Sequence, residues 1–357
     1  MPYPNYEGKH AHPALTEPSA FVRYWIEHGV LPAEHRAPHS VVLLYQRSVF
    51  DAVLASDVSP FAPRGRRNTA FLDLHVFDAT DGQVGVVGGF GIGAPAAVAT
   101  MESLAAIGVR RFVGLGTAGA LRGGLDTGDV VVCDRAVRDE GVSHHYLPSA
   151  RFADADRGLT AHVHGALSAA GLAPTMVSAW TIDAPFRETV LEARHYADEG
   201  VAVVEMEAAA LFAVGAVRGV EVASAFAISD SLADGEWVPQ FGDPRLAVRL
   251  AAMVTATVDA LAALPVPPAR ELLAEHRPRE QPTGVLVEPG RDPADHDVVA
   301  PRSVARTDPP PQCAPGPQRP RSEHEDRPED DGRHGTGGDA ESDEPGAGGT
   351  DGDGDDE

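Results

Sequence analysis

The sequence predicts an α/β fold in which helices flank a mixed, partly parallel central sheet. Between residues 39 and 265, short β-branched apolar segments alternate with segments of helical periodicity. Several apolar segments show no polar alternation, which is typical of strands covered by helices on both faces. After residue 265 the pattern stops, and proline, glycine and charged residues dominate. We therefore expect an N-terminal arm (1–38), one catalytic domain (39–265) and a tail (266–357).

The individual elements follow from this alternation. We expect strands at Val41–Leu44, Val84–Val87, Arg111–Leu115, Val130–Cys133, Thr175–Ser178, Val201–Val204 and Val222–Ile228. We expect helices at Phe21–His28, Ser48–Ala55, Ala94–Ile107, Leu159–Ala170, Glu188–Asp198, Glu207–Arg218 and Pro244–Leu264. Ligands of open α/β sheets bind at the carboxyl ends of strands, so residues near those ends are the first candidates for a site.

Charge is distributed unevenly along the chain. The formal net charge is −24, and Ser322–Glu357 alone contains 15 acidic residues against two arginines. Such a tail cannot bury enough apolar surface to fold, so we expect it to be disordered. An acidic surface repels the phosphates of nucleic acids and anionic lipids, and we expect neither as a partner. Lys9 is the only lysine; a halophilic source or a GC-rich genome would each explain this composition.

Cysteine usage and hydropathy indicate the compartment. Cys133 and Cys313 form no disulfide framework and no zinc-binding spacing. The N-terminus has no apolar signal region, and no apolar run reaches the roughly 20 residues of a membrane span. We expect a cytoplasmic protein with no metal ion and no membrane contact.

Two glycine-rich segments follow predicted strands. Gly114–Gly119 matches the GxGxxG pattern of dinucleotide-binding proteins, with Asp134 in the position of the ribose-binding acid. That fingerprint requires a helix at its third glycine, but further glycines interrupt one here, so a strand–loop–strand connection is favoured over nicotinamide binding. The second segment, Gly88–Pro95, precedes a helix. Its glycines let backbone N–H groups approach a ligand, although a tight strand–helix turn is the alternative.

Three longer segments occur in a fixed order along the chain. They are GGFGIGAPAAVATMESLAAIGVRRFVGLGTAGAL, GDVVVCDRAVRDEGVSHHYLP and VVEMEAAALFAVGAVRGVEVASAFAISDSL. Together they resemble the nucleoside phosphorylase family, which includes purine nucleoside and uridine phosphorylases and methylthioadenosine nucleosidases. The resemblance covers about Val41 to Leu264. It implies cleavage of an N-glycosidic bond, inorganic phosphate as co-substrate, no other cofactor, and a homo-oligomer ranging from dimer to hexamer.

The resemblance implies a sugar site at VEMEAAA. Glu207 would accept hydrogen bonds from the ribose hydroxyls, Met206 would pack against the sugar, and Glu205 would lie close by. A carboxylate beneath the sugar favours the positive charge of an oxocarbenium-like transition state. The alternative is that both glutamates only begin a helix. His12 is the candidate for a histidine that reaches the ribose of a neighbouring subunit.

The resemblance also implies a base site. Asp230, with Ser229 beside it, matches the acid that protonates or hydrogen-bonds N7 of a purine, which favours purine substrates; an N-cap is the alternative. Phe186 is the first candidate for stacking on the base and Trp180 the second. His144 and His145 lie in a segment similar to uridine phosphorylases, where a surface or subunit contact is as plausible as a ligand contact.

The phosphate site departs from the family pattern. Thr117 keeps the expected hydroxyl, and Arg67, beside Arg66, is a candidate to reach across a subunit boundary. Arg47 is displaced from the expected arginine position, and Gly114 stands where the family carries a strand arginine. The glycine loop, represented by Gly91, would add backbone donors. The catalytic base of the nucleosidases is also missing, since Gln46 lies in that region. Phosphorolysis is therefore the first hypothesis, hydrolysis the second, and nucleoside binding without turnover the third.

Overall fold

The computed structural model describes Tyr6 and residues 8–55, 63–69 and 72–266, with the backbone alone for 63–69. All of these belong to one compact unit. The predicted tail lies outside the described residues, apart from Val266.

The strands are β1 (Ser40–Leu44), β2 (Pro63–Thr69), β3 (Leu72–Phe77), β4 (Val84–Gly88), β5 (Arg111–Ala120), β6 (Val130–Asp139), β7 (Phe152–Asp154), β8 (Thr175–Ile182), β9 (Val201–Glu205), β10 (Glu221–Ser231) and β11 (Val238–Pro239). The helices are α1 (Pro18–Glu27), α2 (Arg47–Ala55), α3 (Ala94–Ala106), α4 (Ser143–Tyr146), α5 (Arg157–Ala169), α6 (Val190–Asp198), α7 (Ala208–Arg218) and α8 (Pro244–Ala263). Short 3-10 helices are η1 (Lys9–Ala11), η2 (Asp78–Thr80) and η3 (Pro185–Arg187).

The strands form one mixed sheet, as predicted. Its order is β11-β10-β6-β8-β9-β5-β1-β4-β3-β2, with β7 paired to β6. β5 also pairs with β10 in parallel, so β5, β10, β6, β8 and β9 form a closed cycle. This cycle brings the carboxyl ends of β8, β9 and β10 close to the glycine-rich end of β5.

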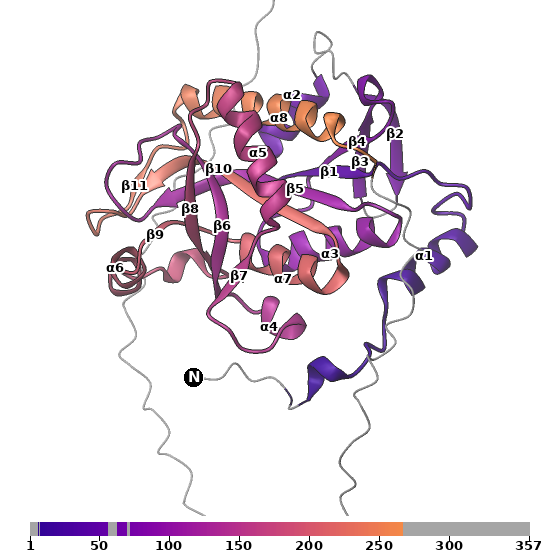
Figure 1. Ribbon diagram of the computed structural model, residues 1–357, viewed down its shortest axis with the longest axis horizontal. Coiled ribbons are helices and arrows are strands. Elements are labelled where there is room, and N and C mark those ends of the chain that lie inside the picture. Colours follow the sequence, from indigo (N-terminus) through magenta and orange to yellow (C-terminus); the bar gives the residue numbers. More distant parts are fainter. Residues whose placement is uncertain (1–5, 7, 56–62, 70–71, 267–357) are drawn as a thin grey trace, which may run out of the picture. The chain divides into compact units, whose positions relative to one another are not determined.

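Helices cover both faces of the sheet, with α3 and α7 on one side and α2, α5 and α8 on the other (Figure 1). Strand β1 shows why its sequence has no polar alternation. Val41 and Leu43 pack into the hydrophobic cluster that contains α3 and α7, whereas Val42 and Leu44 pack into the cluster of α2, α5 and α8. All four are buried.

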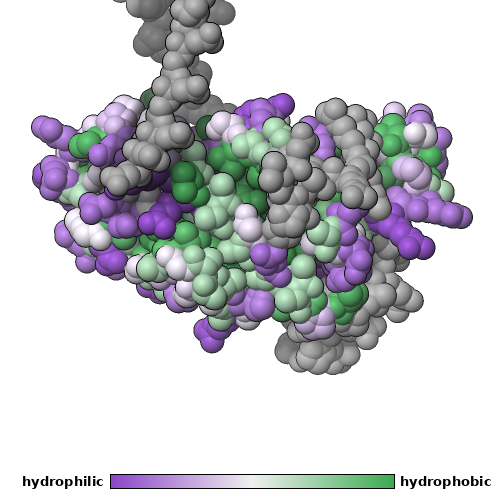
Figure 2. Space-filling model, turned by 90° about the horizontal axis from the view of Figure 1, so that it is seen from above, coloured by the Kyte–Doolittle hydropathy of each residue, from purple (hydrophilic) through white to green (hydrophobic). Residues whose placement is uncertain are grey.

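Helix α8 meets the length and hydropathy of a membrane span, but length and composition are the only grounds for this. Its apolar side packs against the sheet through Leu250, Met253 and Val258, which are buried. Figure 2 views this side of the molecule, where hydrophobic residues occupy the middle of the visible surface and hydrophilic residues surround them. A groove of about 220 Å³ separates α8 from α2.

The segment assigned to the N-terminal arm contributes to the core. Helix α1 buries Val22 and Trp25, and Leu31 follows them into the cluster of α3 and α7. Residues 18–31 therefore pack against the domain that follows them.

Four strands extend well beyond their predicted ends: β5 to Ala120, β6 to Asp139, β8 to Ile182 and β10 to Ser231. The loop predicted after Leu115 is therefore wrong, because Gly116 and Gly119 lie in β5. As predicted, no helix opens at the third glycine, and a turn follows Ala120. Asp230 likewise lies within β10, where it pairs with Gly119 of β5.

Candidate active site

Acidic residues gather where four strands of the closed cycle end. Asp139 ends β6 and Glu140 follows it, Asp183 follows β8, Glu205 ends β9, and Asp230 lies near the end of β10. Glu140, Glu205 and Asp230 are buried. This is the carboxyl edge at which the sequence predicts a site.

Glu205 anchors the turn between β9 and α7. Its Oε2 accepts hydrogen bonds from the backbone N–H groups of Glu207, at 2.7 Å, and Ala208, at 2.8 Å. Its Oε1 accepts a hydrogen bond from the Thr181 hydroxyl, which in turn accepts one from the N–H of Ala209 at 3.0 Å. Glu205 therefore satisfies the first turn of α7, as an acid at a helix N-terminus does.

Glu207 holds the glycine loop against α7. It occupies the N-cap position of α7 and is 5% exposed. Its Oε1 accepts a hydrogen bond of 2.5 Å from the N–H of Gly93, the N-cap residue of α3. Gly93 has φ +91°, and the Met206 Cε lies 3.9 Å from the point where a Cβ on Gly93 would be. The predicted sugar residues Glu205, Met206 and Glu207 thus meet the predicted glycine loop.

Burial raises the pKa of Glu205 to about 7. Burial, and then the charge of Glu205, raise the pKa of Glu207 to about 8. Glu205 accepts three hydrogen bonds that favour its charged form, so it retains the negative charge more readily. The Glu207 carboxyl accepts a hydrogen bond from the backbone N–H of Gly93. Of the two glutamates, Glu207 therefore takes up the shared proton near neutral pH.

Asp230 is buried, with 9% of its surface exposed, and both of its carboxyl oxygens accept hydrogen bonds. Its Oδ1 accepts a hydrogen bond of 2.6 Å from the Ser229 hydroxyl, and its Oδ2 accepts one of 2.9 Å from the indole N–H of Trp237. A Cβ on Gly119 would lie 3.0 Å from Asp230 Oδ2, so glycine at that position of β5 leaves room for the carboxyl group. The structure thus brings Ser229 and Asp230 together, on the strand beside β5.

The predicted phosphate residues are only partly assembled. The Thr117 hydroxyl accepts a hydrogen bond of 2.9 Å from Gln46. The Arg47 guanidinium pairs with Asp51 at 2.7 Å, and its Nη1 lies 3.1 Å from the place of a Cβ on Gly89, so it reaches the glycine loop. Gly91 is exposed in that loop with φ +95°.

Arg67 lies in β2, paired with Leu74, and its side chain is outside the described residues. Arg111, near the other end of β5, pairs with Glu221.

Tyr45 occupies the space left by the glycines of β5. A Cβ on Gly114 would lie 2.4 Å from the Tyr45 hydroxyl, and one on Gly116 would lie 2.6 Å from the Tyr45 ring. Burial, and then Glu207 and Glu205, raise the pKa of Tyr45 well above its usual value. The buried hydroxyls of Tyr45 and Ser224 both border Gly114, and neither has a hydrogen-bond partner among the described residues. An arginine side chain at position 114 would collide with this phenol.

The two predicted stacking residues have different placements. Trp180 is fully buried in β8, and its indole N–H donates to Asp139 at 2.9 Å. It packs within the core, so this placement does not fit contact with a base. Phe186 is 99% exposed in η3. Glu188, just beyond η3, is close enough to Asp230 that burial and the Asp230 charge raise its pKa to about 7.

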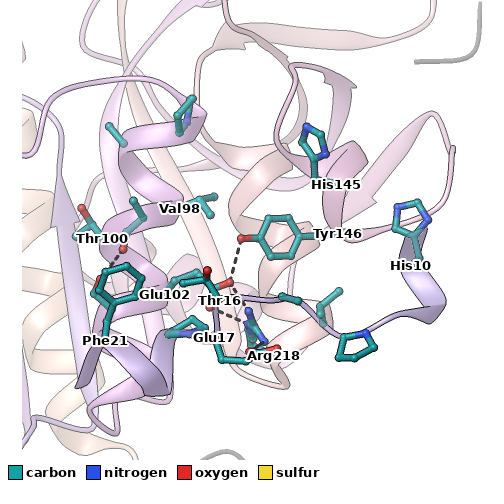
Figure 3. A pocket seen from close by; sticks show the side chains of 18 of the residues that line it. His10, Thr16, Glu17, Phe21, Val98, Thr100, Glu102, His145, Tyr146 and Arg218 are labelled. Atoms are coloured by element: carbon teal, nitrogen blue, oxygen red, sulfur yellow. Dashed lines mark hydrogen bonds and ion pairs between the residues drawn. The ribbon is translucent and has the colours of Figure 1, made fainter. Parts of the chain in front are cut away.

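A cavity of about 1030 Å³ lies between the N-terminal segment and helix α3 (Figure 3). Phe90 and Pro95 of the glycine loop line it, but Glu207 and Asp230 do not. Inside it, Arg218 binds Glu102 through two hydrogen bonds of 2.7 and 2.8 Å.

The predicted histidines lie at this cavity. His12 is exposed at its edge, and no described contact joins it to Glu207. His10 donates a hydrogen bond to the carbonyl of His144 at 3.0 Å, and Lys9 contacts His145. His144 and His145 thus hold the N-terminal segment within one chain. Among the described residues, no group of three or more His, Cys, Asp or Glu side chains could hold a metal ion.

Sequence reasoning missed Tyr45, Glu140, Asp183, Glu188 and Trp237. Tyr45 directly follows the predicted strand Val41–Leu44, and this signal would have found it. Glu140 and Asp183 follow strands that extend beyond their predicted ends, and Trp237 acts through a chain reversal, so the sequence carries no such signal for them.

Comparisons with known proteins agree with this geometry. Residues 50–259 match the phosphorylase superfamily. A uridine phosphorylase of Haemophilus influenzae is 39% identical over 94 residues, 26% of this chain and 37% of that protein. A DeoD-type purine nucleoside phosphorylase of Bacillus cereus is 30% identical over 152 residues, 42% of this chain and 65% of that protein. The chain thus spans less than two thirds of either relative.

A solved structure shares the fold. It is a purine nucleoside phosphorylase from Toxoplasma gondii in complex with immucillin-H, with a TM-score of 0.55 and 20% identity. The similarity covers 63% of this chain and 91% of that chain.

A mixed sheet with a closed cycle of strands and paired buried carboxylates at its carboxyl edge defines an α/β protein of the phosphorylase type. The match over residues 50–259 makes the relationship specific. The chain belongs to the phosphorylase superfamily.

Proposed function

We propose that the protein cleaves the N-glycosidic bond of a purine nucleoside, with inorganic phosphate as the co-substrate. The observation that carries this proposal is the meeting of Glu207 with the glycine loop at Gly93, close to Glu205 and Met206. The relatives are named as nucleoside phosphorylases.

In this proposal Glu207 binds the sugar. It is the less firmly held carboxyl of the pair, because among the described residues its side chain accepts backbone hydrogen bonds from Gly93 and Met206 alone, whereas Glu205 accepts three, and it can accept further bonds from the ribose hydroxyls. Hydrogen bonds from the ribose hydroxyls lower the pKa of Glu207 and hold its side chain as a carboxylate. The negative charge then stabilises the positive charge that develops on the sugar as the C1′–N bond breaks.

The base departs toward Asp230. A proton from the Asp230 carboxyl passes to N7 of the purine as the bond electrons move into the ring, and the carboxylate remains. The Ser229 hydroxyl, 2.6 Å from Asp230, stabilises that carboxylate.

Phosphate would bind between the glycine loop and Thr117. The N-terminus of α3, the Thr117 hydroxyl and the Arg47 guanidinium supply donors there. Arg67 of a neighbouring subunit is the proposed additional cation, which makes a homo-oligomer part of the proposal.

Hydrolysis is the second candidate, and Tyr45 is the observation that favours it. The phenol fills the place of a strand arginine at Gly114, and Glu205 and Glu207 lie close to it. Neutral hydroxyls and carboxylates bind a dianion poorly, whereas water needs no cation.

A base-release assay tests both candidates. Inosine, adenosine and uridine are each incubated with the full chain at zero and at saturating phosphate. Phosphorolysis predicts purine release that rises at least tenfold with phosphate and yields ribose 1-phosphate. Equal rates at both phosphate concentrations, with free ribose as product, support hydrolysis. Stabilisation by nucleosides without release of any base contradicts both and supports nucleoside binding alone.

A further inference from the structure

The hairpin after β10 carries an exposed aromatic pair beside the proposed acid. Residues 232–237 connect β10 to the two-residue strand β11, in which Pro239 pairs with Asp230. Trp237 is 61% exposed and Phe241 is 57% exposed, and their ring centroids are 6.2 Å apart. Exposed aromatic rings that lie side by side form an apolar surface on which a flat ligand can stack.

Trp237 also controls the carboxyl group itself. Its indole N–H donates to Asp230 Oδ2, while Ser229 donates to Oδ1. The indole therefore occupies the carboxyl oxygen that a leaving base would contact, so Oδ2 must be released before it can face the base.

The hairpin is bonded to the rest of the sheet at its base. Its backbone bonds at Leu232, which donates to Ala120 at 2.8 Å, and at Gln240, which donates to Ser229 at 3.0 Å. At its tip, Gly235 has φ +78° and lies against Arg194 of α6. Between these points the Trp237 side chain has its one described hydrogen bond to Asp230.

We propose that Trp237 is the base-recognition residue of this site: it covers Asp230 when the site is empty and stacks on the purine when the site is filled. This rests on the function proposed above. On binding, the indole leaves Oδ2 and stacks on the base, so that Oδ2 faces N7. The proton that Asp230 donates in the proposed function passes to N7 as the C1′–N9 bond breaks and its electron pair moves into the base. The indole N–H returns to Oδ2 as the base leaves.

Intrinsic fluorescence tests the contact directly, because the chain has three tryptophans and the other two are buried. Acrylamide quenching is measured on the full chain without phosphate, with adenine, hypoxanthine or uracil added. We expect the purines to protect Trp237 and to change its emission, and W237F to lose this response. Y24A, which removes an exposed aromatic side chain of α1, is the matched control and keeps it.

Kinetics separate the two roles of the indole. W237A, which removes ring and donor, should raise KM for inosine about tenfold, as the loss of one stacking contact does. W237F keeps a ring but loses the N–H. Its KM should stay within about twofold, while kcat should fall about fivefold, because one hydrogen bond to the Asp230 carboxyl group is lost as the base leaves.

The outcomes distinguish this inference from the proposed function. Purine protection of Trp237 without release of base from any nucleoside would support the contact and contradict the enzyme. Release of base with unchanged quenching, and with wild-type kinetics in W237A and W237F, would overturn the role of Trp237 alone. Neither protection nor release would overturn both.

Discussion

At the scale of single residues, Glu205 and Glu207 have different roles. The Glu205 carboxylate accepts three hydrogen bonds and holds the first turn of α7. Glu207 has the higher pKa and the freer oxygen. Proximity of two carboxyl groups with different hydrogen bonding is the usual way in which their proton affinities are separated.

The pKa of Glu207 predicts a pH dependence. The empty enzyme should need deprotonation of Glu207 near pH 8 to bind the sugar, so kcat/KM for inosine should rise with pH up to about 8. Ribose hydroxyls stabilise the carboxylate, so the acid limb of kcat should lie at lower pH. Stopped assays from pH 5 to 9 measure both limbs. Coincident limbs, or activity highest at pH 5, would argue against this role.

The contact between Tyr45 and Gly114 predicts a specific rescue. G114A places a Cβ 2.4 Å from the Tyr45 hydroxyl and should destabilise the protein by about 1–3 kcal/mol. In Y45F/G114A the nearest remaining ring atom is 3.4 Å away, so most of the loss should be recovered. Urea unfolding of the wild type, G114A, Y45F and Y45F/G114A gives the free energies of unfolding for a double-mutant cycle. Additive effects would mean that the phenol does not fill this space.

At the scale of elements, α3 and α7 are joined by a buried ion pair. Arg218, the last residue of α7, makes two bonds to Glu102 of α3, and Tyr146 donates a third at 3.0 Å. The side chains of Arg218 and Glu102 are 17% and 9% exposed. This pair fixes the two helices whose N-termini carry Glu207 and Gly93.

Loss of that pair should be costly for stability. R218M leaves a buried carboxylate and should lower the free energy of unfolding by about 2–4 kcal/mol. E102Q/R218M removes the stranded charge and should recover part of this. R245M, which breaks an exposed pair with Asp243, serves as the control and should change Tm little. An R218M variant as stable as R245M would contradict the argument.

Elements whose sequence pattern lies within the element itself are predicted correctly. Strand β1 has an apolar β-branched run and helix α3 begins after a glycine loop with proline in its first turn, so both are predicted from the sequence. Glycine favours turns, so the sequence predicts a loop after Leu115, whereas β5 continues to Ala120 with Tyr45 beside Gly116 and Asp230 beside Gly119. β2, PRGRRNT, has no apolar alternation at all. Trp237 reaches Asp230 only because the chain reverses between them.

At the scale of the whole molecule, the acidic site should make stability fall with rising pH. Glu207 has a folded pKa of about 8 against 4.5 in an unfolded chain, so the folded state binds more protons between these values. Its stabilising contribution is complete below about pH 4.5 and is lost as pH rises through 8. E207Q should therefore raise Tm relative to the wild type at pH 8.5 but not at pH 5. The same difference at both pH values would refute this.

The central claim is that the carboxylates at this edge of the sheet cleave a nucleoside, and E207Q tests it most directly. The measurement is kcat/KM for release of hypoxanthine from inosine by the wild type and by E207Q, at pH 8 with saturating phosphate. Loss of a transition-state charge contact predicts a fall of about 100-fold or more in the variant, with a fold that still unfolds cooperatively. Wild-type rates in E207Q would contradict the account.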